Sequence, residues 1–520
     1  MTATRATHLR RLLAVVVGLT VASVTLSGCL FTPIQFGKNS ASPSHGPDTS
    51  GVSADLKPFY AQTVVWRACN GGDECSRISV PLDWNAPSRG KAQLAVIRHR
   101  ATDGSAQGAL LVNPGGPGAS GVQLIRDSVE YAVGSDLEKH YDVIGFDPRG
   151  VGGSTPAVRC YDATDMDSFL FDLPTQKRNT PAWVAEELSN FKQFGQACDR
   201  NSAGILSHID TVSAARDMDV IRAVLGQKKL DYLGYSYGTF LGATYAGLYP
   251  NRVGHMVLDG ALDPSVSALD VSVAQGIGFE SALKAYMAYC LRQKGCPFTG
   301  TVADGMSDLG AMLAQVDADP LPNSDGRQLG ADSLMTAIVS ALYAQSSWKY
   351  LTQALDGVAN GDPSIAFQLA DFYYNRVDGR YEDNSFEAFN AYNCMDYPSG
   401  ETAGQIAAAQ QQLKQKAPTI APYWSVQVDT CAEWPVKTAV TRQQIHASGA
   451  GPIVVIGTSN DPATPYAWAK SLASQLDSGV LITRIGQGHT GFNKGNSCVD
   501  DAVNGYFLNG TTPQNGLVCR

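Results

Sequence analysis

Three residues of this sequence, Ser236, Asp461 and His489, have the types and neighbours that nucleophilic attack on a carbonyl requires. Ser236 is the centre of a G-x-S-x-G stretch at residues 234–238. A serine hydroxyl is a weak nucleophile near neutral pH, so an imidazole must take its proton. A carboxylate holds that imidazole in the right tautomer and stabilises its cation. We therefore predict a hydrolase in which Ser236 forms an acyl-enzyme, His489 is the base and Asp461 orients the base.

The residues around Ser236 predict a sharp turn from a strand at 230–233 to a helix at 239–248. Gly234 and Gly238 fit this interpretation, because a Cβ at either position would collide with neighbouring backbone in so tight a turn. The helix would direct its free N–H groups at the site, which suits a developing oxyanion. The alternative is an accidental Gly/Ser turn, and the flanking strand and helix argue against it.

Asp461 and His489 follow two apolar, strand-like runs late in the chain, at 452–456 and 480–485. Both side chains would then lie at the carboxyl ends of parallel strands, where the sites of open sheets form. The stretch between them has room for one helix and one strand. Asp259 is the rival acid, because it also ends a predicted strand.

A glycine-proline loop at residues 113–118 follows a short buried strand predicted at 109–112. Glycine lets bare backbone approach a substrate closely. In the arrangement that the serine motif predicts, one oxyanion N–H comes from such a loop and the other from the residue after the nucleophile. We therefore assign the backbone N–H groups of Gly116 and Tyr237 to an oxyanion hole, with Gly115 as the neighbouring alternative. A purely structural turn is the competing interpretation.

A second glycine-rich loop follows the strand predicted at 141–146, and it contains Asp147 and Arg149. We predict that these two residues form an ion pair that braces the loop under the site. A catalytic role is the less favoured interpretation for both.

Length and charge limit the class of protein. The chain has 520 residues, 44% of them hydrophobic, which allows a large core and is too long for one minimal domain. Its formal net charge of −9 provides no basic face, so we expect no nucleic acid partner. The sequence contains no C-x-x-C spacing, which makes zinc and thioredoxin-like chemistry weak interpretations. We predict neither a metal nor a cofactor.

The first 28 residues predict a bacterial lipoprotein signal peptide, with three arginines before an apolar run. The run ends in Leu-Ser-Gly before Cys29, which resembles a lipobox, where the cysteine thiol carries a diacylglycerol anchor. The alternative is an uncleaved anchor helix with a chance cysteine. Residues 29–55 are rich in Ser, Pro and Gly and predict a flexible tether. We therefore expect an exported protein, held at the cell membrane or cell wall.

The other ten cysteines also favour export, because disulfides persist outside the cytoplasm. Their number is even, and they fall in pairs that are near neighbours in the sequence. The simplest pairing is Cys69–Cys75, Cys160–Cys198, Cys290–Cys296, Cys394–Cys431 and Cys498–Cys519.

The order of the expected strands and helices predicts an α/β fold with a doubly wound, mostly parallel sheet. Between residues 262 and 446 the strand-helix alternation gives way to helical periodicity, which we interpret as an inserted, mainly helical cap. The sheet resumes after the cap. The core would then comprise residues 56–261 and 447–520.

These motifs resemble those of the α/β-hydrolases in the tripeptidyl-aminopeptidase and prolyl-aminopeptidase group. The loop at 113–118 matches the family's H-G-G-P-G motif, with Asn-Pro in place of the initial His. Residues 145–150 and 234–238 match the next two motifs, and the order Ser, Asp, His is that of α/β-hydrolases. The resemblance is closest to exported tripeptidyl-aminopeptidase-like enzymes of actinobacteria, which include envelope lipoproteins called carboxylesterase A.

The resemblance implies a peptide or protein substrate, and small esters as well, because peptidases and esterases share these motifs. It also implies that acidic groups of the cap hold the substrate's free amino terminus. Asp396, in a stretch that resembles a cap motif of these enzymes, is our candidate, and a surface acid beside a disulfide is the alternative. Two other functions stay open: a carboxylesterase for short acyl esters, and a surface binding lipoprotein without turnover.

Overall fold

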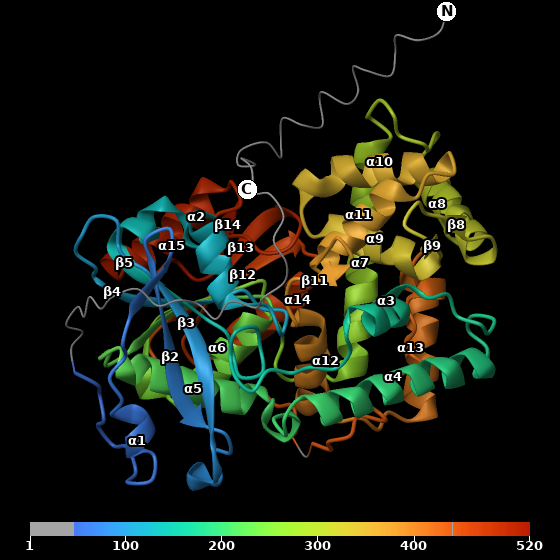
Figure 1. The fold of residues 1–520 in the computed structure, drawn as a ribbon. Coiled ribbons are helices and arrows are strands. Elements are labelled where there is room, and N and C mark those ends of the chain that lie inside the picture. The colour runs from blue at the N-terminus through green and yellow to red at the C-terminus, as the bar shows by residue number, and fades with distance from the viewer. Residues whose placement is uncertain (1–45, 439) are drawn as a thin grey trace, which may run out of the picture. The chain divides into compact units, whose positions relative to one another are not determined.

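A ten-stranded, mostly parallel sheet forms the centre of the fold (Figure 1). The computed structural model describes residues 46–438 and 440–520, so the predicted signal peptide and Cys29 lie outside the described residues. In spatial order, the strands are β1 (Arg67–Asn70), β2 (Asp73–Pro81), β3 (Lys91–His99), β5 (Tyr141–Phe146), β4 (Gly108–Asn113), β6 (Leu230–Tyr235), β7 (Val253–Asp259), β12 (Ile453–Asn460), β13 (Gly479–Gln487) and β14 (Leu517–Cys519). The strands β1, β2, β3 and β5 pair antiparallel along the sheet, and the pairs from β5 to β14 are parallel.

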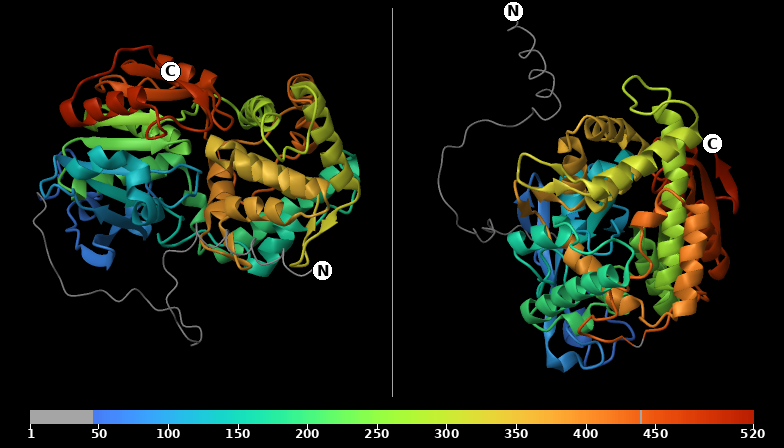
Figure 2. Two further views of the ribbon diagram at one scale, coloured as in Figure 1. Left: turned by 90° about the horizontal axis from the view of Figure 1, so that it is seen from above. Right: turned by 90° about the vertical axis from the view of Figure 1, so that its right-hand side faces the viewer.

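Helices cover both faces of the sheet, as predicted for a doubly wound fold (Figures 1 and 2). Successive strand residues point to opposite faces. Leu110 and Val112 of β4 accordingly pack with α2 (Gly121–His140) and α15 (Ser497–Asn509). Leu111, between them, belongs to the cluster of the other face. That face is covered by α5 (Thr211–Val224), α6 (Tyr237–Leu248) and α14 (Tyr466–Gln475).

A mainly helical insertion lies between β7 and β12, as the sequence predicted, and it has a hydrophobic cluster of its own. Its helices are α7 (Ala268–Cys290), α8 (Val302–Ala318), α9 (Ala331–Leu342), α10 (Trp348–Ala359), α11 (Ser364–Tyr373), α12 (Ser385–Asp396) and α13 (Ala403–Lys416). Two short ribbons accompany them, β8 (Leu321–Pro322) with β9 (Gln328–Leu329) and β10 (Arg376–Val377) with β11 (Arg380–Tyr381). Across residues 46–438 and 440–520, none of the helices combines the length and apolar character that crossing a membrane requires.

The residues that pack together in the cap are not the same as the residues that the sequence assigned to it. The helix α3 (Ala163–Phe171) precedes Ser236 in the chain, yet its Phe171 belongs to the cap's hydrophobic cluster, whereas Phe194 and Cys198 of α4 (Pro181–Asn201) belong to the core cluster. Conversely, α12 packs on the core through Ala388 and Tyr392. Asn384, just before α12, donates side-chain hydrogen bonds to Gly150 O and Val158 O, both at 2.8 Å. Helical periodicity identifies the apolar face of a helix, but it does not tell whether that face packs on the core or on the cap.

The predicted flexible tether does not reach residue 55. Asp48 N–H donates to Ala223 O at 2.9 Å, and the Asp48 carboxylate pairs at 2.9 Å with the fully buried Arg222. The short helix α1 (Lys57–Tyr60) follows, and Tyr60 OH donates to Asp219 at 2.8 Å. Composition favoured a loose linker here. Partners far along the chain instead hold the segment from residue 48 onward against the core.

The predicted ion pair between Asp147 and Arg149 is wrong. Arg149 instead pairs with Asp217 at 2.6 Å, and both side chains are fully buried. The other guanidinium hydrogens of Arg149 go to backbone carbonyls, including Leu82 O at 3.0 Å. Asp147 accepts hydrogen bonds from Ser120 Oγ and from two backbone N–H groups. Because Arg149 and Asp217 lie 68 residues apart, adjacency in the sequence pointed to the wrong partner.

We expect Arg149→Met to lower the free energy of unfolding by about 3–5 kcal/mol, because it leaves Asp217 buried without its counter-charge. Urea unfolding followed by circular dichroism measures this loss. Arg126→Met is the matched control. Arg126 pairs with Asp127, but the two side chains are 42% and 48% exposed, so its loss should stay below about 1 kcal/mol. Equal, small losses in both variants would contradict the structural role of Arg149.

The ten cysteines of the described residues form five disulfides in the pairs that the sequence predicted. They are Cys69–Cys75, Cys160–Cys198, Cys290–Cys296, Cys394–Cys431 and Cys498–Cys519. Cys160–Cys198 joins α4 to the segment before α3, and Cys394–Cys431 joins the end of α12 to the segment after α13. Cross-links of this kind restrict the unfolded chain and stabilise the folded one.

Candidate active site

Ser236 lies at a strained turn between β6 and α6, as the G-x-S-x-G stretch predicted. Its φ and ψ are 55° and −123°, a conformation that costs energy for any residue with a side chain. A Cβ on Gly234 would lie 2.4 Å from Gly238 O, and a Cβ on Gly238 would lie 2.9 Å from Asn113 O. Both positions therefore require glycine. Ser236 N–H donates to Asp259 O at 2.9 Å, which ties the turn to the end of β7.

The glycine-proline loop after β4 lies directly against this turn. A Cβ on Gly115 would lie 2.5 Å from Tyr235 O and 3.1 Å from Tyr237 N, so only glycine fits there. Gly115 N–H donates to the side chain of Asn113 at 3.0 Å. In the described part of the chain, no hydrogen-bond acceptor is found for Gly116 N–H. Of the two glycines, Gly116 therefore has the N–H that is free to bind an anion.

Tyr237 is the first residue of α6, so its N–H has no acceptor within the helix. Its side chain is buried, and its hydroxyl forms a hydrogen bond with Thr211 Oγ1. The helix dipole adds partial positive charge at this end of α6. The start of α6 is thus suited to stabilise negative charge beside Ser236.

The strands β12 and β13 bring Asp461 and His489 together beyond their carboxyl ends. His489 Nδ1 donates to the carboxylate oxygens of Asp461, at 3.0 Å and 2.9 Å. The Asp461 side chain is fully buried. It also accepts from Ala463 N–H at 3.0 Å and from Thr490 N–H at 3.2 Å. These donors fix the carboxylate, and the carboxylate in turn fixes the plane and tautomer of the imidazole.

Thr464 belongs to this arrangement, although it was not among the residues predicted from the sequence. Its hydroxyl donates to Asp461 at 2.9 Å and lies 3.2 Å from His489 Nδ1. Its backbone N–H donates to the other oxygen of Asp461 at 2.9 Å. A signal was present, because an aspartate in a Pro-containing turn commonly accepts the N–H groups that follow it. Thr464 thus braces the acid and contacts the base.

The rival acid, Asp259, has different partners. Its buried carboxylate accepts from Gly491 N–H at 2.9 Å and from Phe492 N–H at 2.8 Å, just after His489. Burial raises the pKa of Asp259 to about 6, against the lowering effect of these two donors. Within residues 46–438 and 440–520, no hydrogen bond joins its side chain to His489. The structure therefore places Asp461 against the imidazole and uses Asp259 to hold the loop that follows.

Two opposing effects act on the pKa of His489. Burial would lower this pKa, but the negative charge of Asp461 and the hydrogen bond to it raise it above the usual range. His489 Nε2 is buried and has no hydrogen-bond partner among the residues that the structure describes. The bond to Ser236 Oγ is thus not formed here. Such contacts often form only when a substrate is bound.

His489 and Ser236 nevertheless contact neighbouring residues, Gly260 and Asp259. A Cβ on Gly260 would lie 3.0 Å from His489 Cε1, and Gly260 directly follows Asp259, whose carbonyl accepts Ser236 N–H. The structure therefore gathers the three predicted residues at one edge of the sheet, beyond the carboxyl ends of β6, β12 and β13.

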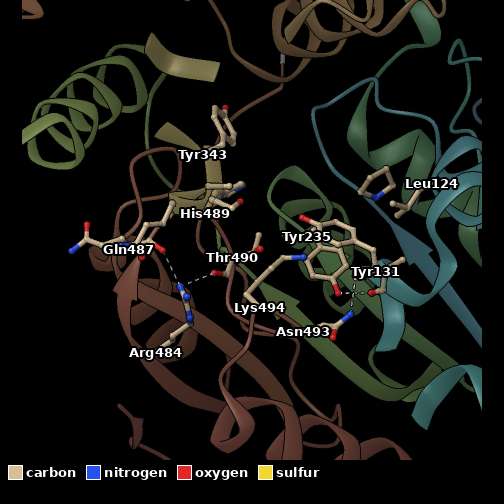
Figure 3. A pocket seen from close by; sticks show the side chains of 16 residues that line it. Leu124, Tyr131, Tyr235, Tyr343, Arg484, Gln487, His489, Thr490, Asn493 and Lys494 are labelled. Carbon is tan, nitrogen blue, oxygen red and sulfur yellow. Dashed lines mark hydrogen bonds between the residues drawn. The ribbon is translucent and has the colours of Figure 1, made fainter. Parts of the chain in front are cut away.

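The cap contacts the base directly. Tyr343, just after α9, accepts the backbone N–H of His489 with its carbonyl at 2.8 Å. The Tyr343 ring meets the imidazole edge-on, with centroids 5.4 Å apart. Residues 343–346 also line a cavity of about 530 Å³ beside His489 (Figure 3). The cap segment therefore forms one wall of the space next to the imidazole.

Asp396 does not have the contacts of a substrate anchor. It is only 3% exposed, and its carboxylate accepts from Thr211 N–H at 2.9 Å and from Thr211 Oγ1 at 2.6 Å. Through Thr211 it is linked to the Tyr237 hydroxyl. Burial raises the pKa of Asp396 to about 7. Each carboxylate oxygen thus accepts from Thr211, and these contacts indicate a positioning role at the start of α6, while the role of amine anchor stays a prediction.

In the part of the chain that the structure describes, no three histidine, cysteine, aspartate or glutamate side chains lie close enough together to hold a metal ion. The residues around Ser236 instead offer a nucleophile, a base with its acid, and free backbone N–H groups. Together these groups can perform acyl transfer.

Comparison with known proteins agrees with this geometry. A family model described as TAP-like protein matches residues 417–519, which include Asp461 and His489. Carboxylesterase B of Mycobacterium tuberculosis is 40% identical over 508 residues, covering 96% of this chain and 95% of the relative. Serine protease Hip1 of the same species is 35% identical over 494 residues, covering 90% of this chain and 93% of the relative.

A third relative is more distant. Tripeptidyl aminopeptidase of Streptomyces lividans is 30% identical over 456 residues, covering 86% of this chain and 83% of the relative. These relatives span nearly the same length as this chain and carry the names of a protease, an aminopeptidase and an esterase. The finer resemblance to carboxylesterase A stays a prediction.

Proposed function

We propose that this chain, which belongs to the TAP-like family of α/β-hydrolases, is a serine peptidase of the cell envelope that releases short peptides from amino termini. The chain is a hydrolase, as its family is. One observation carries the proposal: the fully buried Asp461 holds His489 at 2.9 Å, at the same edge of the sheet as the strained turn of Ser236. This arrangement is that of a base prepared to activate a serine.

The proposed reaction divides the work among these groups. Ser236 Oγ attacks the carbonyl carbon of the scissile bond while His489 Nε2 takes its proton. The N–H groups of Gly116 and Tyr237 donate to the oxyanion of the tetrahedral intermediate. His489 then gives the proton to the leaving amine, and an acyl-enzyme remains. A water, deprotonated by His489, releases the acyl group, while Asp461 stays ionised throughout.

An esterase is the second candidate, and the relative that is 40% identical and named carboxylesterase B favours it. Ester and amide hydrolysis need the same nucleophile, base and oxyanion hole, so the groups around Ser236 support both. An amide is the harder substrate, because its amine leaves only after protonation. The choice therefore depends on the binding sites for the rest of the substrate.

A hydrolysis screen tests the proposed function. Purified protein is offered tripeptidyl, single-aminoacyl and short-chain acyl reporters with the same fluorescent leaving group, beside Ser236→Ala. We expect the highest kcat/KM on the tripeptidyl reporter and no turnover above background in Ser236→Ala. Faster turnover of short acyl esters than of every peptide would support the esterase instead. Turnover that survives Ser236→Ala would refute both.

The proposed location rests on Cys29 and the leader before it. In an actinobacterial host, Cys29→Ala should move the protein from the membrane or wall fraction to the culture medium, because the thiol that carries the lipid is gone. Mass spectrometry of the amino-terminal peptide should show a diacylglycerol on the wild type and none on the variant. Identical fractionation of the two proteins, with no acyl mass, would refute the anchor.

Asp396→Asn tests the positioning role that the contacts of Asp396 suggest. We expect kcat to fall by the same factor, about tenfold, on free-amine peptides and on their N-acetylated counterparts, because one buried hydrogen bond to Thr211 is weakened in both cases. The measurement is a pair of kcat values for each peptide. A loss confined to the free-amine peptides would restore the amine anchor predicted from the sequence.

A further inference from the structure

The cavity of about 530 Å³ beside His489 has walls from three parts of the chain (Figure 3). Leu124 and Tyr131 of α2 form one wall, and cap residues 343–346 form another. The third wall is the end of β13 and the loop before α15, which contains His489. Pro114 and Tyr235 also line it, so the cavity adjoins both the oxyanion loop and the serine turn.

The charged side chains of this cavity are cationic. Arg484 and Lys494 line it, together with His489, and the lining includes no aspartate or glutamate. The hydrogen bonds of Arg484 go to uncharged oxygens, such as Gln487 O at 3.1 Å. Lys494 Nζ lies 3.3 Å from the centroid of the Tyr131 ring. In residues 46–438 and 440–520, neither cation forms an ion pair.

Two acids that interact electrostatically with these cations, Asp259 and Asp500, already have other partners. Asp259 accepts two backbone N–H groups behind the loop, and Asp500 accepts Asn493 N–H at 2.7 Å. Neither acid lines the cavity. Arg484 and Lys494 therefore present their charge to a concave space with partly apolar walls, where a charge-assisted hydrogen bond is stronger than in water. An anion is the ligand that such a space favours.

The position of the cavity, beside His489, indicates which portion of the substrate it would bind. His489, the base, donates its proton to the leaving group, so the leaving portion of the substrate must lie on the side of His489. We propose that this cavity binds a carboxylate in the leaving portion of the substrate through Arg484 and Lys494. The inference rests on the proposed serine hydrolase function and adds a preference to it. The enzyme should favour substrates with an acidic residue directly after the scissile bond.

Two matched peptides test this preference. They share the acyl portion that the reporter screen finds best, and their leaving portions are Glu-Ala amide and Gln-Ala amide. Glutamate and glutamine have nearly the same shape, so the pair isolates the charge. We expect kcat/KM to be roughly tenfold higher for the glutamate peptide, the effect of one charge-assisted hydrogen bond. The ratio should shrink as salt is added.

Variants then assign the preference to the cavity. Lys494→Gln should reduce the ratio of the two kcat/KM values to near one. Arg484→Lys keeps the charge but loses the forked geometry, and it should reduce the ratio less. Lys470→Gln is the control, because Lys470 also lies over a tyrosine ring but outside the cavity, 5.1 Å from the centroid of Tyr466. It should keep the wild-type ratio.

A binding measurement separates this inference from the catalytic proposal. Ser236→Ala is titrated with the released fragments, Glu-Ala amide and Gln-Ala amide, and followed by calorimetry or NMR. Tighter binding of the glutamate fragment, lost in the Ser236→Ala/Lys494→Gln double variant, would support the cavity even if the enzyme prefers esters. Equal affinities for the two fragments, or a glutamate preference that survives Lys494→Gln, would overturn it. Turnover that survives Ser236→Ala would instead refute the proposed function.

Discussion

Replacement of Ser236 or His489 by alanine should each lower kcat by roughly 10⁶-fold, and the double variant should lose little more. The two side chains act as a unit, because the serine hydroxyl is a poor nucleophile without its base and every step of the base belongs to the reaction that Ser236 begins. What remains is the stabilisation by the N–H groups of Gly116 and Tyr237 and the binding of the substrate. Single-turnover rates on the best reporter, with enzyme in excess, measure these losses.

Chemical labelling gives an independent measurement of the same prediction. A serine-directed fluorophosphonate should label Ser236 in the wild type, slowly in His489→Ala and not at all in Ser236→Ala. Ser474→Ala, at an exposed serine on α14, is the control and should keep full labelling and turnover. Labelling of another serine in the wild type, or multiplied losses in the double variant, would show that the nucleophile and its base are assigned wrongly.

The second large effect is expected at the acid. Asp461→Asn should lower kcat by about 10⁴-fold, because the amide favours the wrong imidazole tautomer while the site keeps its shape. In this protein the amide would also meet three donors, Ala463 N–H, Thr464 N–H and Thr490 N–H, which now converge on a carboxylate. One face of the new side chain would be mismatched with them. Steady-state kinetics and a crystal structure of the variant test both statements.

The pH dependence of kcat/KM distinguishes this electrostatic role of Asp461 from a general loss of structure at the site. The base must be neutral to accept a proton, so kcat/KM falls as the pH drops through the pKa of His489. Asp461 raises that pKa, whereas burial lowers it. The acid limb of Asp461→Asn should therefore lie at lower pH than that of the wild type. An unmoved acid limb would mean that Asp461 does not set the charge of His489.

Asp259→Asn is the comparison variant, since Asp259 was the other candidate for the acid. It weakens only the hydrogen bonds to Gly491 and Phe492, so its kcat should fall far less than that of Asp461→Asn. Near-full activity in Asp461→Asn together with a large loss in Asp259→Asn would reverse the assignment.

The sequence predicted the serine turn and its partners because local rules govern them. Gly234 and Gly238 are required by contacts within a few residues of Ser236, and such requirements can be read from spacing alone. Asp461 and His489 follow strands that belong to one parallel sheet, whose carboxyl ends necessarily meet at one edge. The choice between Asp461 and Asp259 needed coordinates, since both end strands of that sheet.

The wrong predictions concern residues whose partners are distant in the sequence. Arg149 pairs with Asp217, and Asp48 with Arg222, because the fold brings α5 to both of them. The contacts of Asp396 are also distant in the sequence, because α12 packs on the core, whereas its role as an amine anchor, which the resemblance to a cap motif implies, stays a prediction. No periodicity or composition identifies such contacts, because they depend on which surfaces the folded chain brings together. The cationic cavity was missed for the same reason, since its walls come from three separate segments.

The hydrogen bond from His489 N–H to Tyr343 O, at 2.8 Å, joins the core to the cap at the residue that we predict to be the base. Residues 343–346 line the cavity beside His489, so a large substrate that enters there would push them aside. That motion must either break this bond or pull the histidine loop with it. In both cases the imidazole loses its alignment while residues 343–346 are displaced. Admission of substrate and acyl transfer would then exclude each other, so Ser236 could be acylated only after residues 343–346 have returned to their place against His489.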